Sequence, residues 1–184
     1  MVYPVSFKTW FMTVSLHPAS DQDIDFLFQV YAGTRADEMA LVDWTVEQRV
    51  AFLQMQFNAQ RQHYRAYYPA ATYHIILRED VPIGRLIVNR SLTEILLIDI
   101  ALLPEYRNAG IGTALVRQLQ DEAMRTGLPV RLHVETFNSA RRLYERLGFV
   151  PVDETGIYLE MEWKAPDQPA SRAWPDQTTR SRRQ

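Results

Sequence analysis

One nearly continuous apolar run, ILLIDIALL at residues 95–103, constrains the fold more than any other feature of the chain. An apolar run without alternation is typical of a strand that is buried on both faces, at the centre of a sheet. It is too short to cross a bilayer, and it contains Asp99. Pro104 and a turn with Gly110 and Gly112 follow it. The sequence therefore predicts a central strand, a glycine turn and a helix in direct succession.

Helical and strand-like patterns alternate on both sides of this run, and no internal repeat is visible. Two capping boxes, Ser20 with Asp23 and Thr45 with Gln48, mark the starts of the first two helices, and residues 33–43 between these helices resemble a turn. The predicted strands span 13–16, 72–78, 83–89, 95–103, 130–136, 149–153 and 157–163, and the predicted helices span 24–31, 46–63, 110–126 and 140–147. This order, βααβββαβαββ, predicts one α/β (α+β) domain.

Apolar stripes indicate which helix faces are buried. In the second helix Val46, Val50, Leu53 and Phe57 share one stripe, and we expect that stripe to be the buried face. In the helix at 110–126, apolar residues recur at four-residue steps, which predicts a buried face along its whole length. These apolar residues are Ile111, Leu115, Leu119 and Ala123.

The two ends of the chain differ from its middle. Its 184 residues leave room for one domain and some excess length. We expect an N-terminal extension at 1–11, a folded domain at 12–164 and a disordered, basic tail at 165–184, which is rich in proline and arginine. No segment has the pattern of a signal peptide or a membrane span, so the expected location is the cytoplasm, with no membrane partner.

Composition argues against several classes of function. The formal net charge is -2, from 20 Lys and Arg against 22 Asp and Glu, which gives no overall positive field to hold a nucleic acid. The lack of cysteine excludes disulfides and thiolate chemistry. His17, His63 and His74 show no metal-ligand spacing, so we expect no metal. Oxygen and nitrogen groups must therefore carry the chemistry.

The glycine turn at residues 107–112 suits a diphosphate. Glycines between a strand and a helix let main-chain N–H groups face outward, and the helix N-terminus adds its dipole. The turn is not a P-loop, because no Gly-Lys-Ser/Thr follows. It is not the dinucleotide fingerprint either, because the third glycine and the later acidic residue are missing. A different phosphorylated ligand is therefore expected.

The same segment resembles the GNAT superfamily of acyl-CoA-dependent N-acyltransferases. The R-x-x-G-x-G motif of that family is complete as Arg107, Gly110 and Gly112, after Pro-Glu-Tyr at 104–106. Residues 138–149, NSARRLYERLGF, are similar to the family's second motif, N-x-A-x-x-L-Y-x-x-L-G-F. The resemblance implies a mixed, mostly antiparallel, twisted sheet flanked by helices. It also implies acetyl-CoA as the co-substrate.

The resemblance further implies which residues would hold acetyl-CoA. Main-chain groups of the central strand would bind the pantetheine arm and polarise the thioester carbonyl, and amides of the glycine turn would hold the pyrophosphate. Asn108 stands where the family often has glycine, but asparagine tolerates the left-handed conformation. Arg107 is either a phosphate ligand or a solvated side chain, and Asn138 is either a cofactor contact or a helix cap. The implied cofactor-binding residues are Ile100, Ala101, Leu102, Arg107, Asn108, Ala109, Gly110, Ile111, Gly112, Thr113 and Asn138.

Three residues are candidates for catalysis. Tyr144 resembles the family's general acid, which protonates the departing sulfur, although a tyrosine on the apolar stripe of its helix is also a common packing residue. His133 is one candidate base. Counting back from the asparagine of the second motif puts it where ribosomal-protein N-terminal acetyltransferases of this superfamily carry a catalytic glutamate. Counting back from Tyr144 puts Leu132 at that position instead. Asp99 is the other candidate base, because burial would raise the pKa of its carboxyl, or else it is a hydrogen-bonded structural residue. Glu135 shares a strand face with His133 and could orient it.

We therefore expect an N-acetyltransferase that passes an acetyl group from acetyl-CoA to a primary amine, by direct attack in a ternary complex. The acceptor is a small-molecule amine or a protein N-terminus or lysine. Asp37, Glu38 and Asp43 beside Trp44 are one place to receive a cationic acceptor, or are simply a solvated loop. The protein would be a monomer or a homodimer. The alternative is a catalytically inactive CoA-binding sensor or interaction module, and a partner bound through the basic tail is a further one.

Overall fold

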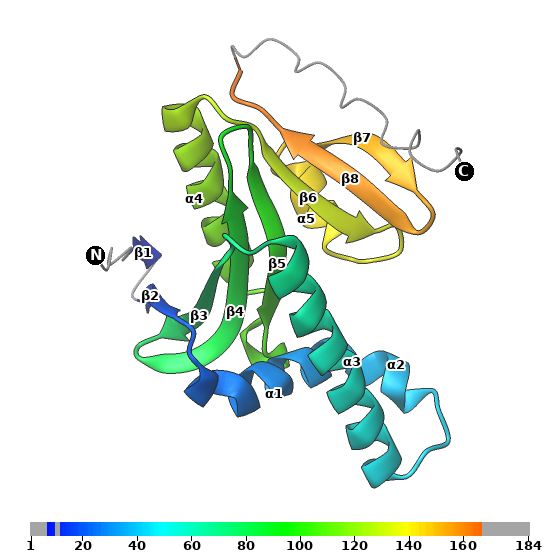
Figure 1. The fold of residues 1–184 in the computed structure, drawn as a ribbon. Helices are drawn as coiled ribbons and strands as arrows, with labels where there is room; N and C mark the ends of the chain where they lie inside the picture. Colours follow the sequence, from blue (N-terminus) through cyan, green and yellow to red (C-terminus); the bar gives the residue numbers. More distant parts are fainter. Residues whose placement is uncertain (1–6, 10–11, 167–184) are drawn as a thin grey trace.

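The order of elements along the chain follows the predicted order, with two additions (Figure 1). The computed structural model describes residues 7–9 and 12–166. The strands are β1 (Phe7–Thr9), β2 (Met12–Pro18), β3 (Thr72–Arg78), β4 (Val81–Arg90), β5 (Ile95–Leu102), β6 (Val130–Glu135), β7 (Val150–Thr155) and β8 (Tyr158–Trp163). The helices are α1 (Ile24–Thr34), α2 (Ala36–Ala40), α3 (Val46–Tyr67), α4 (Ile111–Thr126) and α5 (Arg141–Arg146), with 3-10 turns η1 (Asp21–Asp23) and η2 (Pro104–Tyr106).

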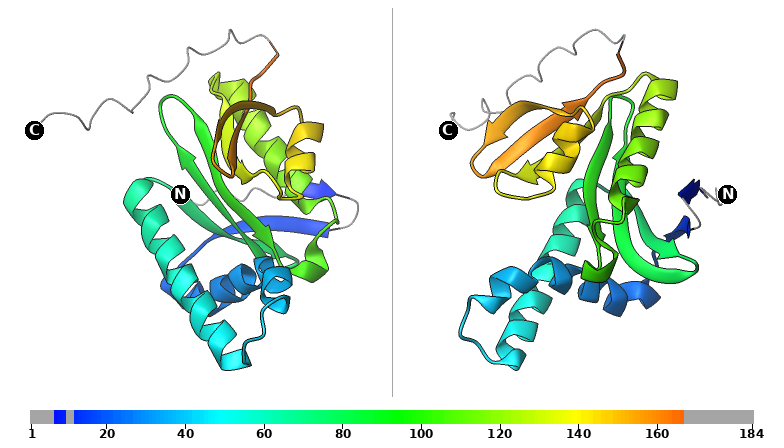
Figure 2. Two further views of the ribbon diagram at one scale, coloured as in Figure 1. Left: turned by 90° about the vertical axis from the view of Figure 1, so that its right-hand side faces the viewer. Right: turned by 180° about the vertical axis from the view of Figure 1, so that it is seen from behind.

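The strands form one sheet in the order β1-β2-β3-β4-β5-β6-β8-β7. Every neighbouring pair is antiparallel except β5 with β6, so the predicted mixed, mostly antiparallel sheet is confirmed. The predicted central position of the apolar strand is confirmed as well, because β5 has four strands on one side and three on the other. Figure 2 shows α4 and α1 on opposite faces of the sheet.

The main core lies between α4 and the sheet. The predicted buried stripe of α4 is confirmed, and it packs against Leu97 of β5 and Leu132 of β6. On the other face, Val30 of α1 packs against Ala101, the buried alanine of β5. Residues on β5 therefore alternate between two apolar layers, and this alternation fixes the face to which each side chain points.

β5 and β6 stay together for only three residue pairs, which end at Leu97 opposite Leu132. Beyond that point β5 runs on to Leu102 and β6 runs on to Glu135, and the two strands no longer pair with each other (Figure 1). On its other side β5 remains paired with β4, with a bulge at Ile98. The edge of β5 that faces β6 therefore has main-chain groups without a strand partner, and the two strands diverge around an opening.

Two predictions about the first helices were wrong. The stretch at 33–43, predicted as a turn, contains α2. The predicted stripe of α3 is buried only at Leu53 and Phe57, because Val46 and Val50 are 69% and 48% exposed. The reason is positional: α2 and the first half of α3 extend past the edge of the sheet, so no strand lies beneath the first turns of α3 (Figure 1).

β1 falls inside the segment predicted as an N-terminal extension and pairs with β2 as an added edge strand. The rest of that segment, residues 1–6 and 10–11, lies outside the described residues, as does most of the predicted C-terminal tail, residues 167–184. Within the described residues, the helices include none with the length and apolar character that a membrane span requires.

Candidate active site

A cleft of about 380 Å³ opens where β5 and β6 diverge. Helices α1, α2 and α3 line it from one side, and α5 lines it from the other. Of the predicted site residues, the cleft brings together Asp99, Ile100, Ala101, His133, Asn138 and Tyr144. Leu102 and residues 107–113 are not in its lining; they continue from the end of β5 into the start of α4.

The unpaired edge of β5 gives this cleft its main-chain donors and acceptors. Because pairing with β6 ends at Leu97, the groups of Ile98 to Leu102 that point away from β4 have no partner in the sheet. Main-chain N–H groups held rigidly in this way can polarise a carbonyl placed in the opening. This is the arrangement expected for the pantetheine arm and the thioester.

The turn before α4 has the conformation that its sequence predicts. Asn108 adopts the left-handed conformation with φ 60°, and Gly110 does so with φ 79°. The first helical hydrogen bond of α4 runs from Ala114 N–H to Gly110 C=O, so the preceding amides have no partner within the helix. A Cβ on Gly110 would meet no atom within 4 Å, so the turn borders open space at this residue. The geometry suits a pyrophosphate.

Arg107 joins this turn to two other elements. Its Nε donates to the Leu102 carbonyl at 3.0 Å, and its Nη2 donates to the Gly33 carbonyl at 2.9 Å. The side chain therefore fixes the end of β5 and the end of α1 to the glycine turn. Contact between Arg107 and a phosphate stays a prediction. It would use the N–H donors of the guanidinium that these two hydrogen bonds do not occupy.

Tyr144 is both a core residue and a lining residue of the cleft. Its ring packs edge-on against Phe149, with 5.8 Å between the ring centroids, and the side chain belongs to the main core. Burial raises the pKa of the Tyr144 hydroxyl well above its ordinary value, and the negative charge of Asp99 raises it further. The hydroxyl therefore stays protonated near neutral pH and is a hydrogen-bond donor in the cleft, while the same shift makes it a weaker acid. Its place in the core and in the lining of the cleft is compatible with both the packing role and the proposed acid role.

Asp99 is held in an ion pair. Its Oδ2 lies 2.5 Å from the Arg85 guanidinium, and Arg85 also donates to Gln60 Oε1 at 3.0 Å. Tyr64 of α3 lies close by: burial raises the pKa of its hydroxyl, and the charge of Asp99 adds to that. This pairing favours the structural interpretation of Asp99, because its carboxylate already has a cationic partner.

Sequence reasoning did not identify Arg85, Gln60 or Tyr64 as site residues. One signal was available: Arg85 and Asp99 are opposite charges inside two consecutive apolar strands, and buried charges in proteins are usually paired. For Gln60 and Tyr64 the sequence carries no such signal, because their role depends on where α3 crosses the sheet.

His133 projects to the opposite side of β6 from Leu132, which is buried in the core under α4. The His133 side chain is 50% exposed and its Nε2 lies 3.9 Å from Glu160 Oε2 on β8. Glu135 lines the cleft on the same strand face. Of the two residues that motif counting left open, only His133 has a side chain that can exchange protons.

Asn138 forms a local cap. Its Oδ1 accepts a hydrogen bond from the Ala140 N–H at 2.9 Å, in the turn that leads into α5. The residue also lines the cleft, so both interpretations of Asn138 from the sequence stay compatible with the structure. Gly112 connects the two motifs, because a Cβ at this position would lie 3.7 Å from Leu143 Cδ2 of α5.

Several acidic side chains line the cleft besides Asp99. Asp37 and Glu38 of α2 line it together with Glu135, and Arg35 pairs with Glu38 at 2.9 Å. Asp43 and Trp44, predicted to act with them, are not in its lining; Trp44 packs against Phe52 instead. Within residues 7–9 and 12–166, no three His, Cys, Asp or Glu side chains are grouped as metal ligands would be.

Comparison with known proteins places this geometry in context. Residues 38–149 match the sequence model of the Acetyltransferase (GNAT) family. Over 72 residues the chain is 40% identical to the [Ribosomal protein bS18]-alanine N-acetyltransferase of Haemophilus influenzae. That stretch is 39% of the chain and 49% of the relative, so the chain spans about half the length of the curated relative that it matches.

Solved structures share the fold over most of the chain. The PaiA N-acetyltransferase of Thermoplasma acidophilum in complex with coenzyme A has a TM-score of 0.64 at 18% identity, over 83% of this chain and 99% of that one. An acetyltransferase from Streptococcus agalactiae has a TM-score of 0.57 at 14% identity, over 85% of this chain and 100% of that one. At such identities the likeness concerns the fold alone.

Proposed function

The chain belongs to the GNAT acetyltransferase family, and we propose that it transfers an acetyl group from acetyl-CoA to a primary amine. One observation carries this proposal: the unpaired edge of β5 and the buried Tyr144 line one cleft, and the open turn at Gly110 follows the end of β5 along the chain. The three features correspond to the thioester, the departing sulfur and the pyrophosphate of one extended ligand.

Acetyl-CoA supplies a thioester whose carbonyl carbon can be attacked directly by an amine. Main-chain N–H groups of β5 near Ile100 polarise that carbonyl, and amides at the start of α4 hold the pyrophosphate. As the new N–C bond forms and the C–S bond breaks, Tyr144 gives its proton to the leaving sulfur. A base takes the extra proton from the attacking nitrogen. No covalent enzyme intermediate is needed.

His133 is our preferred base, and Asp99 is the second candidate. His133 is half exposed at the rim of the cleft, whereas Asp99 is paired with the buried Arg85. His133→Gln is expected to lower kcat at least tenfold while CoA binding is unchanged. Asp99→Asn is expected to reduce stability as well as activity, because it leaves the Arg85 charge buried without its partner. Full kcat in a folded His133→Gln protein would remove His133 from the mechanism.

The acceptor is proposed to be a primary amine that carries a positive charge before it reacts. Asp37, Glu38 and Glu135 line the cleft, and such carboxylates attract a cation. Since the Haemophilus relative is a ribosomal-protein alanine N-acetyltransferase, a protein N-terminus that begins with alanine is the first acceptor to test. A small polyamine is the second.

Cofactor binding is tested first, by the thermal midpoint of the full chain with acetyl-CoA, with CoA and with neither. Ligand at about a hundred times its Kd adds about 2.7 kcal/mol of stability, which is several degrees for a domain of this size. Gly110→Asp is the control, because it places a negative charge in the turn that begins α4, and it should abolish the shift. A folded protein with no shift would contradict the proposal.

Turnover is tested by thiol release from acetyl-CoA with alanine-led peptides and with polyamines. Thiol release that depends on the amine supports the transferase. A thermal shift with acetyl-CoA but no turnover with any amine of a broad panel would favour the inactive CoA-binding module instead.

A further inference from the structure

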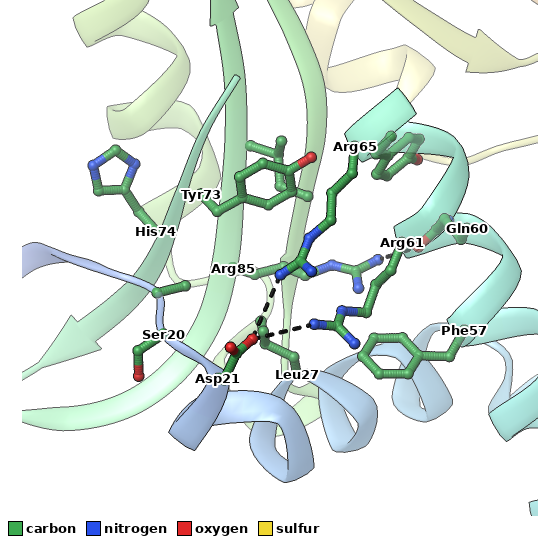
Figure 3. A pocket seen from close by; sticks show the side chains of 13 residues that line it. Ser20, Asp21, Leu27, Phe57, Gln60, Arg61, Arg65, Tyr73, His74 and Arg85 are labelled. Carbon is green, nitrogen blue, oxygen red and sulfur yellow. Dashed lines mark hydrogen bonds and ion pairs between the residues drawn. The ribbon is translucent and has the colours of Figure 1, made fainter. Parts of the chain in front are cut away.

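A second cavity, of about 280 Å³, lies beside the cleft and between α3 and the sheet (Figure 3). We call it the α3 pocket; the residues that matter here are Asp21, Leu27, Phe57, Arg61, Arg65, Tyr73 and Ile87. Gln60, Tyr64 and Arg85 line both this pocket and the cleft, so they stand between the two cavities. The proposed acetyl transfer uses none of the residues specific to the α3 pocket.

Two arginines bring positive charge into this pocket. Arg61 and Arg65 are one turn apart on α3 and both reach toward Asp21, at 3.8 and 3.6 Å (Figure 3). Both separations exceed the length of a good charged hydrogen bond, and the Asp21 side chain is 91% exposed. Two guanidinium groups therefore share one loosely held carboxylate, which leaves room for one more negative charge.

The crowding of these charges is visible at Arg61. Burial lowers the pKa of the Arg61 guanidinium, and the positive charge of Arg65 lowers it further. An arginine remains charged despite such a shift, so the repulsion between the two groups persists in the folded protein. An anion bound between them would relieve it.

Tyr73 forms one wall of the pocket beside Arg65 (Figure 3). Burial raises the pKa of its hydroxyl, although the charges of Arg65 and Arg61 oppose the rise. The hydroxyl itself is fully buried and points away from the two guanidinium groups (Figure 3). Tyr73 therefore contributes its ring to the pocket and no hydrogen bond to the space between the two arginines.

The rest of the pocket is apolar. Leu27 of α1, Phe57 of α3 and Ile87 of β4 line it, and the Arg61 guanidinium lies over the Phe57 ring at 5.6 Å from its centroid. Stacking on the ring holds Arg61 in place before any ligand arrives. A ligand for this pocket therefore needs a compact apolar body at one end and an anionic group at the other.

We propose that the α3 pocket binds a small monocarboxylate with a compact apolar body. The carboxylate lies between Arg61 and Arg65. A single negative charge is favoured over a phosphate dianion, because Asp21 already neutralises one of the two arginines. The volume is just below the usual range for small-molecule sites, about 300–1,000 Å³, so the body is no larger than one ring or a branched chain.

The test is calorimetric titration of the full chain with benzoate, which serves as the probe. Benzoate should bind, whereas benzyl alcohol, which lacks the charge, and acetate, which lacks the apolar body, should bind at least tenfold more weakly. No benzoate binding, or equal binding of benzyl alcohol, would overturn the proposal. Benzoate binding should persist at saturating CoA, because the pocket is separate from the cleft; loss of binding would place benzoate in the cleft and also overturn it.

Variants assign the site. The double variant Arg61→Gln with Arg65→Gln is expected to weaken benzoate binding about tenfold or more. Asp21→Asn should tighten binding, because it removes the competing carboxylate. Arg125→Gln on α4 removes an exposed arginine far along another helix and is the matched control. Thermal unfolding checks that each variant folds, and Arg65→Gln alone replaces the double variant if that one does not.

An unchanged Kd in the arginine variant would refute the assignment, as would weaker binding by Asp21→Asn. All of these measurements use binding alone. They would therefore stand or fall independently of whether the protein transfers acetyl groups.

Discussion

A single oxygen atom distinguishes the two roles of Tyr144. Phenylalanine would fill the same volume in the core against Phe149, so the packing of this region does not depend on the hydroxyl. Proton donation to the departing sulfur does depend on it. The leaving thiolate has an ordinary pKa of about 8.5 and is a tolerable leaving group without help, so the contribution of the acid is modest.

Tyr144→Phe is therefore expected to lower kcat about tenfold to a hundredfold, with little change in the free energy of unfolding. Steady-state kinetics and urea unfolding measure the two effects separately. Tyr67→Phe, at an exposed tyrosine of α3, is the matched control and should leave both unchanged. An unchanged kcat in Tyr144→Phe would leave the residue with its packing role alone.

His74 makes stability depend on pH. Burial lowers its pKa, and the positive charges of Arg90 and His17 lower it further. The unfolded chain therefore binds a proton near the ordinary pKa of about 6.5, whereas the folded chain binds it only at lower pH. The stability that neutral His74 contributes is fully present above the ordinary pKa of about 6.5. It is lost as the pH falls through that value toward the lower pKa of the folded chain.

Between pH 7.5 and pH 5, the wild type is expected to lose more unfolding free energy than His74→Gln, which cannot bind that proton. Urea unfolding at the two pH values measures the difference. Parallel losses in the two proteins would show that His74 does not contribute to this dependence.

At the scale of elements, the close approach of β4 and β5 depends on Gly84. A Cβ at this position would collide with the Ala101 carbonyl oxygen and lie 2.8 Å from Leu102 Cδ2. The first of these is a main-chain atom, which moves only if the pairing of β4 with β5 opens. That pairing sets the register of Arg85 and Asp99, so the glycine supports the cleft from outside it.

Gly84→Ala is expected to destabilise the protein by about 2–3 kcal/mol, as overpacking against a rigid backbone does. Gly112→Ala is the matched control. Its Cβ would make only an ordinary contact with Leu143, and alanine is favoured within a helix, so its stability should be equal or slightly higher. Urea unfolding of both variants decides this; equal stability of the two would contradict the argument.

At the scale of the whole molecule, the sheet consists of two parts that are joined by few hydrogen bonds. β1 to β5 form one part and β6 to β8 the other, and only the three residue pairs from Ile95 to Leu97 connect β5 with β6. The main core under α4 spans both parts. A ligand in the cleft would contact both diverging strands and so would add a second connection between the parts.

CoA is therefore expected to slow amide hydrogen exchange in residues 98–102, 108–113 and 133–135. For amides that exchange only when no CoA is bound, exchange should become about a hundredfold slower when the CoA concentration is about a hundred times its Kd. β2 and β3, which lie away from the cleft, should change little. Exchange measured by mass spectrometry tests this, and protection that persists in Gly110→Asp would separate it from the proposed cofactor site.

Much of the fold follows from short stretches of sequence. The two predicted capping boxes form as expected, at Ser20 and at Thr45, because their partners lie three residues apart on the same turn. The left-handed turn at Asn108 and Gly110, the buried stripe of α4 and the central strand β5 follow likewise. Each depends on backbone preference or on the periodicity of neighbouring residues, which the chain carries within one element.

Other features were decided only when distant elements met. The ion pair of Asp99 with Arg85, the place of His133 at the rim of the cleft, the exposed first turns of α3 and the α3 pocket depend on strand register and on where helices cross the sheet. Local sequence contains neither quantity, because a one-residue shift of register would send every side chain of a strand to the other face. The sequence alone therefore determined the two motifs and every described helix and strand except β1 and α2, while the tertiary structure decided which charges are paired, which apolar residues are exposed and which cavities exist.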